Sequence, residues 1–488
     1  MTAAALTDLP RERTKLLDNL GWIRRNVGPV TPELSDALAD HMNIRRGEVA
    51  EVASFYSYLR LPMDVVRICT GPVCDCKGGR ELLAQNPGAV EVPCIGHCDL
   101  APAMLRGDEV VPTVTHSTNH GPSIDLLADD ELREAPDLPP ERVVAELEAS
   151  GLVGYGGAGF PTFRKWAAVR GYPGPRVVVV NADEGEPGTI KDRYVMELRP
   201  NLLAAGIEVA LRFAEAERGY VYLREEYATA RERVSAALAA RNLPVEIVTG
   251  AGSYVCGEES AMLESMEGRR GMPRLRPPFP VEAGFLGLPT LINNVETLAH
   301  VPAILRGGGA AWPRVRLWSV SGAVAKPGCY EAPVDATARQ LIDDYAGSAT
   351  EEIGALVPGG AASGILPPSA LDVPLTREGL APFGAGPGSA GLQVFPASYP
   401  VLRLLRETMR FFAEESCQKC TPCRIGTRAL EHVLHELDEG RPAMPGRQLE
   451  EWLVAMEKGS ICGLGQGAPV PLRGAMRAWP DLFTPLVD

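Results

Sequence analysis

The feature that most constrains this chain is a run of three closely spaced cysteines, followed by a fourth about forty residues later. The run is Cys417, Cys420 and Cys423, and the distant cysteine is Cys462. Thiolates are soft ligands that suit iron–sulfur clusters, and four of them suit a [4Fe–4S] centre. A structural zinc site is the alternative. Zinc usually takes two thiols from each of two knuckles, so the three-plus-one division favours the cluster.

Length and composition limit what the rest of the chain does. With 488 residues the sequence has room for about three domains or more. A net charge of −14 disfavours nucleic acid or anionic membranes as the main ligand. The sequence shows no run of about eighteen apolar residues and no secretory leader, so we expect no membrane span and no export. The expected compartment is the cytoplasm, where a content of 11 cysteines indicates metal or cluster ligands rather than disulfides.

Shifts in composition and periodicity predict five consecutive domains. The first is helical, the second is a small α/β module, and the third alternates strands and helices. The fourth has short strands with much glycine and proline, and the fifth is helical again. The expected bounds are 1–61, 62–125, 126–314, 315–398 and 399–488.

Particular elements support this division. Thr31 followed by proline predicts a helix start. Residues 64–69 and 90–94 are strand-like and flank a helix that starts near residue 78. Residues 176–181 form a nearly continuous apolar strand, as expected in a buried parallel sheet. An acidic, proline-containing stretch at about 115–145 predicts a linker.

A second set of cysteines lies at the ends of the two strands of the small module. Two strand-end loops side by side would offer four thiolates to a [2Fe–2S] cluster, with backbone amides turned toward the sulfurs. The alternative is a degenerate module whose cysteines ligate nothing. We interpret Cys76 and His97 as residues outside the ligand set, because four cysteines already complete it. The candidate ligands are Cys69, Cys74, Cys94 and Cys98.

A glycine-rich segment, Gly154-Tyr-Gly-Gly-Ala-Gly-Phe-Pro-Thr162, contains the pattern G-x-G-x-x-G. A dinucleotide fingerprint should follow a strand, whereas a helix is predicted before these glycines, so the pattern alone is weak. The turn still exposes backbone N–H groups to a phosphate or a flat ring, and Lys165 adds a positive charge. Phe160 either stacks on an aromatic cofactor or is buried in the core.

An acidic loop follows the apolar strand and contains Asp183, Glu184 and Glu186. Ligands of open α/β sheets bind at the carboxyl ends of the strands. These carboxylates are therefore candidates to accept hydrogen bonds from ribose hydroxyls or a nicotinamide amide. A solvated acidic turn is the alternative. Loops at 252–259 and 291–297 supply further Gly, Tyr, Glu and Asn groups.

Taken together, these segments resemble the NADH-binding flavoprotein subunit of respiratory complex I and its relatives. The shared series is Gly-Gly-Ala-Gly-Phe-Pro-Thr from 156, Asn-Ala-Asp-Glu-Gly-Glu-Pro-Gly-Thr from 181, Tyr-Val-Cys-Gly-Glu-Glu from 254, Pro-Pro-Phe-Pro from 277, Asn-Asn-Val-Glu-Thr from 293 and Glu-Ser-Cys-Gln-Lys-Cys-Thr-Pro-Cys-Arg from 415. The first third of the chain resembles the thioredoxin-like [2Fe–2S] subunit that accompanies that flavoprotein. Their fusion is similar to the diaphorase subunits of soluble NAD-dependent formate dehydrogenases and NAD-reducing hydrogenases.

The resemblance implies an α/β multidomain fold: a thioredoxin-like ferredoxin domain, a Rossmann-like FMN domain, a β-grasp-like insert and a C-terminal helical bundle with the [4Fe–4S] cluster. It also implies that FMN binds at the glycine loop and that NAD stacks over the flavin. The residues implied for FMN are Gly154, Gly156, Gly157, Gly159, Lys165, Asn181, Asp183, Tyr254, Gly257, Glu258, Asn293, Asn294 and Thr297. Those implied around NAD are Phe160, Glu184, Glu186, Glu259 and Phe279.

Three positions depart from the family pattern. Tyr155 stands where the family usually has Arg, which puts one phosphate contact in question. Arg276 stands where Lys is common and keeps the positive charge among the cofactor-binding residues. Only about twenty residues separate Cys74 from Cys94, whereas the separate family subunit has a longer insert there.

We therefore predict an NADH:acceptor oxidoreductase subunit with FMN, [4Fe–4S] and [2Fe–2S] centres and NAD as substrate. Hydride exchange between NAD and flavin needs no general acid or base, so Glu184 and Glu186 are predicted to position NAD and to disfavour NADP. A partner subunit must supply the other half-reaction. We expect a formate dehydrogenase first, a hydrogenase second and complex I third. A flavin-less cluster scaffold, which Tyr155 favours, and a zinc-binding interaction module are the alternatives.

Overall fold

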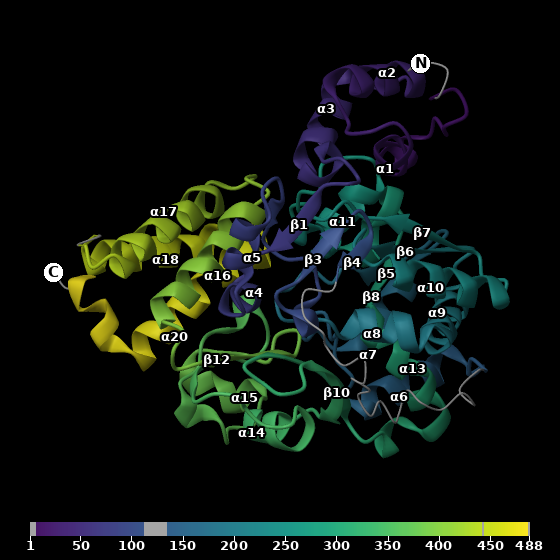
Figure 1. Cartoon of the computed structure of the whole chain (residues 1–488). Coiled ribbons are helices and arrows are strands. Elements are labelled where there is room, and N and C mark those ends of the chain that lie inside the picture. Colours follow the sequence, from purple (N-terminus) through teal and green to yellow (C-terminus); the bar gives the residue numbers. More distant parts are fainter. Residues whose placement is uncertain (1–5, 112–133, 442–443, 487–488) are drawn as a thin grey trace.

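Three four-stranded sheets and two helical regions make up the described part of the chain (Figure 1). The structure is a computed structural model that describes residues 6–111, 134–441 and 444–486. The mixed α/β architecture predicted from the sequence is confirmed. Among the helices of these residues, none combines the length and the apolar character needed to cross a bilayer.

The first 61 residues contribute helices, as the sequence predicts. Their bounds are α1 (Leu16–Asn26), α2 (Pro32–Met42) and α3 (Arg46–Phe55). Thr31 begins α2, because its side chain accepts the backbone N–H of Leu34 at 3.3 Å. A buried ion pair of 2.6 Å between Arg24 and Glu225 fastens these helices to the central domain.

The second region is a small sheet of order β2-β1-β3-β4. Its elements are β1 (Val66–Cys69), α4 (Pro72–Cys76), α5 (Gly79–Gln85), β2 (Val90–Val92), β3 (Met104–Arg106) and β4 (Glu109–Val111). Strands β1 and β2 run parallel, and Cys69 is in register with Val92. The two cysteine loops that follow these strands therefore leave the sheet at the same edge. The predicted boundary at 125/126 and much of the predicted linker lie outside the described residues.

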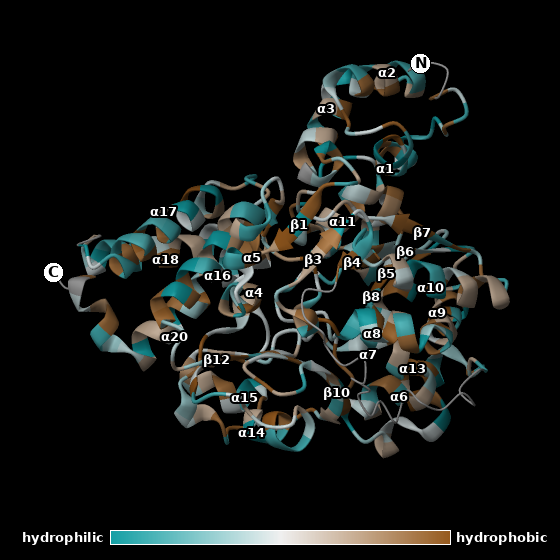
Figure 2. Cartoon of the chain, in the orientation of Figure 1, coloured by the Kyte–Doolittle hydropathy of each residue, from teal (hydrophilic) through white to brown (hydrophobic). Residues whose placement is uncertain are grey.

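The third region is a parallel sheet of order β7-β6-β5-β8, with helices on its faces. Its strands are β5 (Val177–Ala182), β6 (Arg218–Leu223), β7 (Val245–Thr249) and β8 (Thr290–Asn294). Its helices are α6 (Pro140–Ser150), α7 (Thr162–Arg170), α8 (Lys191–Leu198), α9 (Pro200–Ala214), α10 (Ala228–Ala240), α11 (Glu259–Met266), α12 (Pro280–Ala283) and α13 (Val295–Gly307). The central strands β5 and β8 are buried on both faces, and this part of the sheet is brown in Figure 2, whereas the edge strand β7 is largely half-buried. Asn181 and Asn294 are in register, so β5 and β8 end side by side.

The fourth region is a mixed sheet of order β10-β9-β12-β11 with a core of its own. Its elements are β9 (Val315–Gly322), β10 (Gly328–Pro333), α14 (Ala338–Gln340), β11 (Ile353–Val357), α15 (Arg377–Leu380) and β12 (Gly391–Pro396). The absence of long helical periodicity in the sequence agrees with these short elements.

The fifth region is helical. It contains α16 (Val401–Glu415), α17 (Thr421–Asp438), α18 (Gly446–Gly459), α19 (Gly463–Gly467) and α20 (Pro469–Ala478). Helix α16 packs against α17, α20 and the α4 segment of the second region. In Figure 1 the small β1–β4 sheet therefore lies between this bundle and the central sheet.

Candidate cofactor and metal centres

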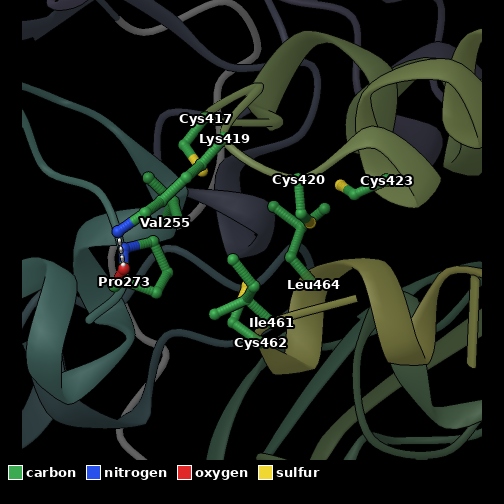
Figure 3. A pocket seen from close by; sticks show the side chains of 9 residues that line it. All are labelled: Val255, Pro273, Cys417, Lys419, Cys420, Cys423, Ile461, Cys462 and Leu464. Atoms are coloured by element: carbon green, nitrogen blue, oxygen red, sulfur yellow. Dashed lines mark hydrogen bonds between the residues drawn. The ribbon is translucent and has the colours of Figure 1, made fainter. Parts of the chain in front are cut away.

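The three-plus-one cysteines surround one cavity, as Figure 3 shows. Cys417 lies in the loop after α16, Cys420 and Cys423 lie at the start of α17, and Cys462 directly precedes α19. The remaining lining residues are Val255, Pro273, Lys419, Ile461 and Leu464. The cavity is thus an apolar pocket whose reactive groups are four thiols and one ammonium group. Within the described residues, no group of three or more His, Cys, Asp or Glu side chains is placed to hold a single metal ion.

The chemistry of this cavity suits a cluster. Burial raises the pKa of Cys423 to about 12 and that of Cys462 to about 11, so a cationic metal centre is required to hold them as thiolates at neutral pH. The backbone N–H groups of Leu464 and Gly465 hydrogen-bond to Cys462. Amide donors to ligand sulfur are one of the means by which proteins tune iron–sulfur centres.

The second cysteine set also meets at one cavity. Cys69, Cys74, Cys94 and Cys98 line it, together with residues of the loops that carry them and with Pro187. Gly71 lets the two loops approach closely, because a Cβ there would lie 2.3 Å from the carbonyl oxygen of Pro93.

The two residues that we placed outside the ligand set, Cys76 and His97, do not line this cavity. Cys76 is half-buried at the end of α4, just beyond the loop. His97 is buried with its ring edge-on to Tyr227 at 5.8 Å, and burial lowers its pKa to about 3. The imidazole is therefore neutral.

The glycine loop lies between α6 and α7 rather than after a strand. Gly154 donates its N–H to the carbonyl of Phe160 at 2.8 Å, and Tyr155 donates its N–H to Oγ1 of Thr297 at 2.9 Å. Gly157 and Gly159 have φ values of +110° and +64°, which favour glycine. The Phe160 ring is 49% exposed, so the buried-core alternative for this residue does not describe it.

Tyr155, the departure from the family pattern, is buried and turned away from this loop. Its hydroxyl donates to the carbonyl of Val315 at 3.2 Å. The guanidinium carbon of Arg316 lies 4.7 Å from the centre of its ring. The tyrosine thus joins the central domain to the β9 sheet, a role that the sequence did not indicate.

Polar side chains gather where β5 and β8 end. Asn181 donates to the carbonyl of Gly257 at 2.8 Å, and Asn294 donates to Asp192 at 2.6 Å. Two atoms here are buried without a hydrogen-bond partner among the described residues, Oδ2 of Asp183 and Nδ2 of Asn293. Buried polar atoms are normally paired, so an acceptor and a donor remain free for a ligand with both kinds of group. The edges of a flavin ring and a ribityl chain offer both, so these residues fit FMN.

The acidic loop is not a solvated turn. Burial raises the pKa of Asp183 to about 7, of Glu184 to about 8 and of Glu186 to about 7. Glu184 accepts the N–H groups of Asp192 and Arg193 at 2.8 and 3.1 Å, so it caps α8. Glu186 accepts the Tyr254 hydroxyl at 2.6 Å and is partly exposed. Its contact with NAD stays a prediction, as does that of Glu184.

The remaining predicted residues form a charged strip beside two aromatic rings. Glu259 lies 3.1 Å from both Lys165 and Arg276. Arg276 also pairs with Glu258, whose carboxylate caps α11. Phe279, like Phe160, is 49% exposed. Exposed rings next to balanced charges suit a flat, charged ligand such as NAD.

Some residues of these sites were missed by reasoning from the sequence. Lys191 is buried and pairs with Asp192 at 2.7 Å and with Glu296 at 3.1 Å. The pair of carboxylates raises the pKa of Lys191 against the opposing effect of burial, so the ammonium stays charged beside Asn294. The sequence offered one signal for it, its position in Lys191-Asp-Arg-Tyr194, which directly follows Thr189-Ile190 at the end of the acidic loop.

Three family models match this chain. A thioredoxin-like [2Fe–2S] ferredoxin model matches residues 2–120, the Nuo51 FMN-binding domain matches 147–303, and the NADH-ubiquinone oxidoreductase-F iron–sulfur binding region matches 403–485. They confirm the predictions of FMN, [2Fe–2S] and [4Fe–4S] cofactors. They also favour the cluster over the zinc alternative at the three-plus-one cysteines.

Curated relatives and solved structures agree with these models. The second NADH-quinone oxidoreductase F-subunit of Rhizobium meliloti is 41% identical over 369 residues, which cover 70% of this chain and 87% of the relative. The corresponding F-subunit of Escherichia coli is 37% identical over 376 residues, covering 71% and 84%. A crystal structure of NAD+-reducing [NiFe]-hydrogenase in the air-oxidized state matches with a TM-score of 0.87 and 31% identity, covering 99% of this chain and 95% of that chain.

Proposed function

The chain belongs to the family of NADH-quinone oxidoreductase F-subunits, NADH-dependent oxidoreductases with FMN and iron–sulfur centres, and we propose that it serves a larger enzyme as its diaphorase subunit. In this role it exchanges hydride with NAD(H) and delivers or receives single electrons at a partner subunit. When bound, FMN would supply the conversion between the electron pair of one hydride and two single-electron transfers, and the clusters would carry one electron each.

One observation carries this proposal: the segment that holds several predicted cofactor contacts also forms part of the wall of the thiol cavity. Val255 and Pro273 of that segment line the cavity. Tyr254 donates its N–H to Glu415 at 2.9 Å, and Lys419 donates to the carbonyl of Pro273 at 2.6 Å. Arg270 also donates to the carbonyl of Cys417 at 3.0 Å. These hydrogen bonds hold the cysteine loop against the flavin module, which supports electron exchange between the two centres.

The chain's own residues bind the flavin and the nicotinamide nucleotide and orient them toward each other. Asn181, Asp183 and Asn293 would hold the flavin at the carboxyl edge of the sheet. Phe160 and Phe279 would hold the nicotinamide nucleotide against it, so that the reacting atoms meet without diffusion. We assign no general acid or base, and the place of Glu184 and Glu186 is to position NAD.

For the partner, the first two of the three expected candidates differ in their support. The sequence puts a formate dehydrogenase first. The structural likeness to the NAD+-reducing [NiFe]-hydrogenase extends through the fused first third of the chain and supports the second candidate, a hydrogenase. Either partner brings the metal site that this chain's motifs lack. The cytoplasm stays the proposed compartment.

Anaerobic purification of the full chain tests the proposal. We expect a yellow protein with a flavin spectrum, with iron and sulfide, which reduces ferricyanide with NADH but not with formate or hydrogen. A colourless zinc protein, or one with clusters and no flavin after reconstitution with FMN, would contradict it. Co-expression with the products of neighbouring genes then identifies the partner, because the complex will reduce NAD+ with either formate or hydrogen.

A further inference from the structure

Charged side chains line one face of α16, the helix that leads into the three-cysteine loop. Arg403, Arg406, Glu407, Arg410 and Glu414 lie along it. Their spacing of three or four residues places them on the same side of the helix. This side faces the small β1–β4 region, since α16 packs against α4 (Figure 1).

This face holds the residue that follows each of the first two cysteines of the [2Fe–2S] site. Asp75 follows Cys74, its side chain is fully buried, and it accepts two hydrogen bonds from Arg403 at 2.8 and 2.9 Å. Thr70 follows Cys69, and Nη2 of Arg410 donates to its carbonyl and to its hydroxyl oxygen, both at 2.9 Å. For both Cys69 and Cys74, the residue that follows in the sequence is therefore hydrogen-bonded to a guanidinium group of α16.

Glu407 closes the network. Its side chain is 1% exposed and accepts from Arg80 at 2.6 Å and from Arg410 at 2.8 Å. Arg80 also lies 3.0 Å from Asp75. Asp75 therefore has two cationic partners, and Glu407 has three, because Arg406 also lies 3.4 Å from it. Forked, charge-assisted contacts of this kind fix geometry, and removing one partner leaves a buried charge uncompensated.

The same helix ends at Glu415, two residues before Cys417. The side chains of α16 thus hold the loop that contains Cys69 and Cys74, and its backbone leads directly into the loop that contains Cys417. Neither the family models nor the resemblance assigns a role to this face.

We propose that Arg403 and Arg410 are positioning residues of the [2Fe–2S] site: they fix the 69–76 loop to α16, and the charge balance of Arg403 with Asp75 sets the reduction potential of that cluster. The inference rests on the assignment of Cys69, Cys74, Cys94 and Cys98 as its ligands. Reduction adds one negative charge to the cluster. A nearby cation therefore raises the potential, and an uncompensated carboxylate lowers it.

The test compares variants of opposite charge change in the anaerobically purified full chain. Arg403→Met removes one of the two cationic partners of Asp75 and leaves Arg80 as the other, Asp75→Asn removes the negative charge, and the double variant makes both changes. The readout is the [2Fe–2S] signal in an EPR potentiometric titration, with the [4Fe–4S] signal as internal reference. We expect about a tenfold change in the ratio of reduced to oxidised cluster at fixed potential, equal to about 59 mV, downward for Arg403→Met and upward for Asp75→Asn.

We expect the double variant to return close to the unmodified value. Arg447→Gln is the matched control, because this arginine is 84% exposed on α18 and pairs with an exposed glutamate. A purely structural network would shift both single variants in the same direction, or leave both potentials unchanged at full iron content. Either result would overturn the proposal.

A milder variant covers the case in which Arg403→Met does not fold. Arg410→Lys keeps the charge but loses the fork onto Thr70, and we expect altered g-values of the [2Fe–2S] signal with unchanged iron content. An unaltered spectrum overturns the positioning role. If the unmodified, reconstituted chain lacks a [2Fe–2S] signal altogether, the ligand assignment fails and this inference falls with it. A missing signal in the unmodified chain is distinguishable from the other negative result, in which the unmodified chain has the signal and the variants show the same one.

Discussion

Gly188 donates its backbone N–H to Sγ of Cys98 at 3.3 Å, across 90 positions of the sequence. The acidic loop of the central sheet therefore contacts the predicted [2Fe–2S] site of the small module. Gln393 of β12 supports this contact, since its side chain donates to the carbonyl of Pro187 at 3.0 Å. Segments that belong to three sheets thus meet beside the thiol of Cys98.

The first prediction concerns Gly188→Ala. A Cβ at this position would lie 2.6 Å from Cγ of Gln393, at a φ of +86°. We expect a loss of about 1–3 kcal/mol in the free energy of unfolding and a lower [2Fe–2S] potential, because the N–H donor moves away from the sulfur. Thermal unfolding and EPR titration measure both. Gly440→Ala is the control, with a similar φ of +68° and open space around the Cβ, and its [2Fe–2S] potential should stay the same.

The second prediction separates ligand cysteines from bystanders. Cys462→Ser should abolish the normal [4Fe–4S] signal while FMN and the [2Fe–2S] signal remain, because a distant cysteine closes the ligand set of a separate centre. Cys76→Ser should change neither signal, since this cysteine does not line either cavity. Iron content per chain and EPR spectra after dithionite reduction decide the matter. Loss of a cluster in Cys76→Ser would contradict the ligand sets given above.

The third prediction addresses the tyrosine in the glycine loop. Tyr155→Phe removes the hydrogen bond to the Val315 carbonyl, so we expect the free energy of unfolding to fall by about 1 kcal/mol. FMN content should not change, because the ring points away from the glycine turn. Denaturant unfolding and flavin absorbance measure the two effects. A large loss of flavin in this variant would show that the hydroxyl belongs to the FMN site.

The fourth prediction is a pH dependence of stability. Burial raises the pKa of Asp183 from 3.8 to about 7, so the folded chain holds a proton that the unfolded chain releases. The stability from this proton is present below about pH 4 and is lost as the pH rises through about 7. Asp183→Asn should remove this dependence, with a slope change of up to about 1.4 kcal/mol per pH unit in the flavin-free chain.

Urea unfolding of the flavin-free chain between about pH 5 and pH 8 measures that slope. The exposed Asp335→Asn serves as the control and should leave it unchanged. An equal slope in Asp183→Asn and the unmodified chain would show that this carboxyl is ionised in the fold.

The fifth prediction concerns the choice between NADH and NADPH. Glu186→Gln keeps an acceptor for the Tyr254 hydroxyl but removes the charge that would repel a 2′-phosphate. We expect the ratio of kcat/KM for NADH to that for NADPH to fall about tenfold, the equivalent of about 1.4 kcal/mol. In the unmodified protein this ratio should rise as the pH passes through about 7, because burial raises the pKa of Glu186 to about 7. The exposed Glu232→Gln is the control, and equal ratios in both variants would refute the role of Glu186.

Local signals predicted much of the fold. Thr31 and the proline after it predict the start of α2, and the valine run at 177–180 predicts a buried parallel strand, since both depend on neighbouring residues alone. The spacing of the cysteines likewise predicted two centres, each of which the structure gathers at one cavity.

Contacts between distant segments could not be predicted in this way. The sequence shows Glu184 as one of three acidic residues, and only the structure reveals that it caps α8. Asp75 and Arg403 are 328 positions apart, and nothing in either local sequence indicates that they pair. The orientation of Tyr155 toward Val315 is a similar case, because it depends on how the β9 sheet docks.

The two cysteine centres occur in one polypeptide. Helix α16 is hydrogen-bonded to the loop of the first centre and leads into the loop of the second. Docking of the small module is therefore intramolecular, governed by an effective concentration rather than by the abundance of a separate protein. Dilution will therefore not separate the two centres, and every chain contains both sets of cysteines in a one-to-one ratio.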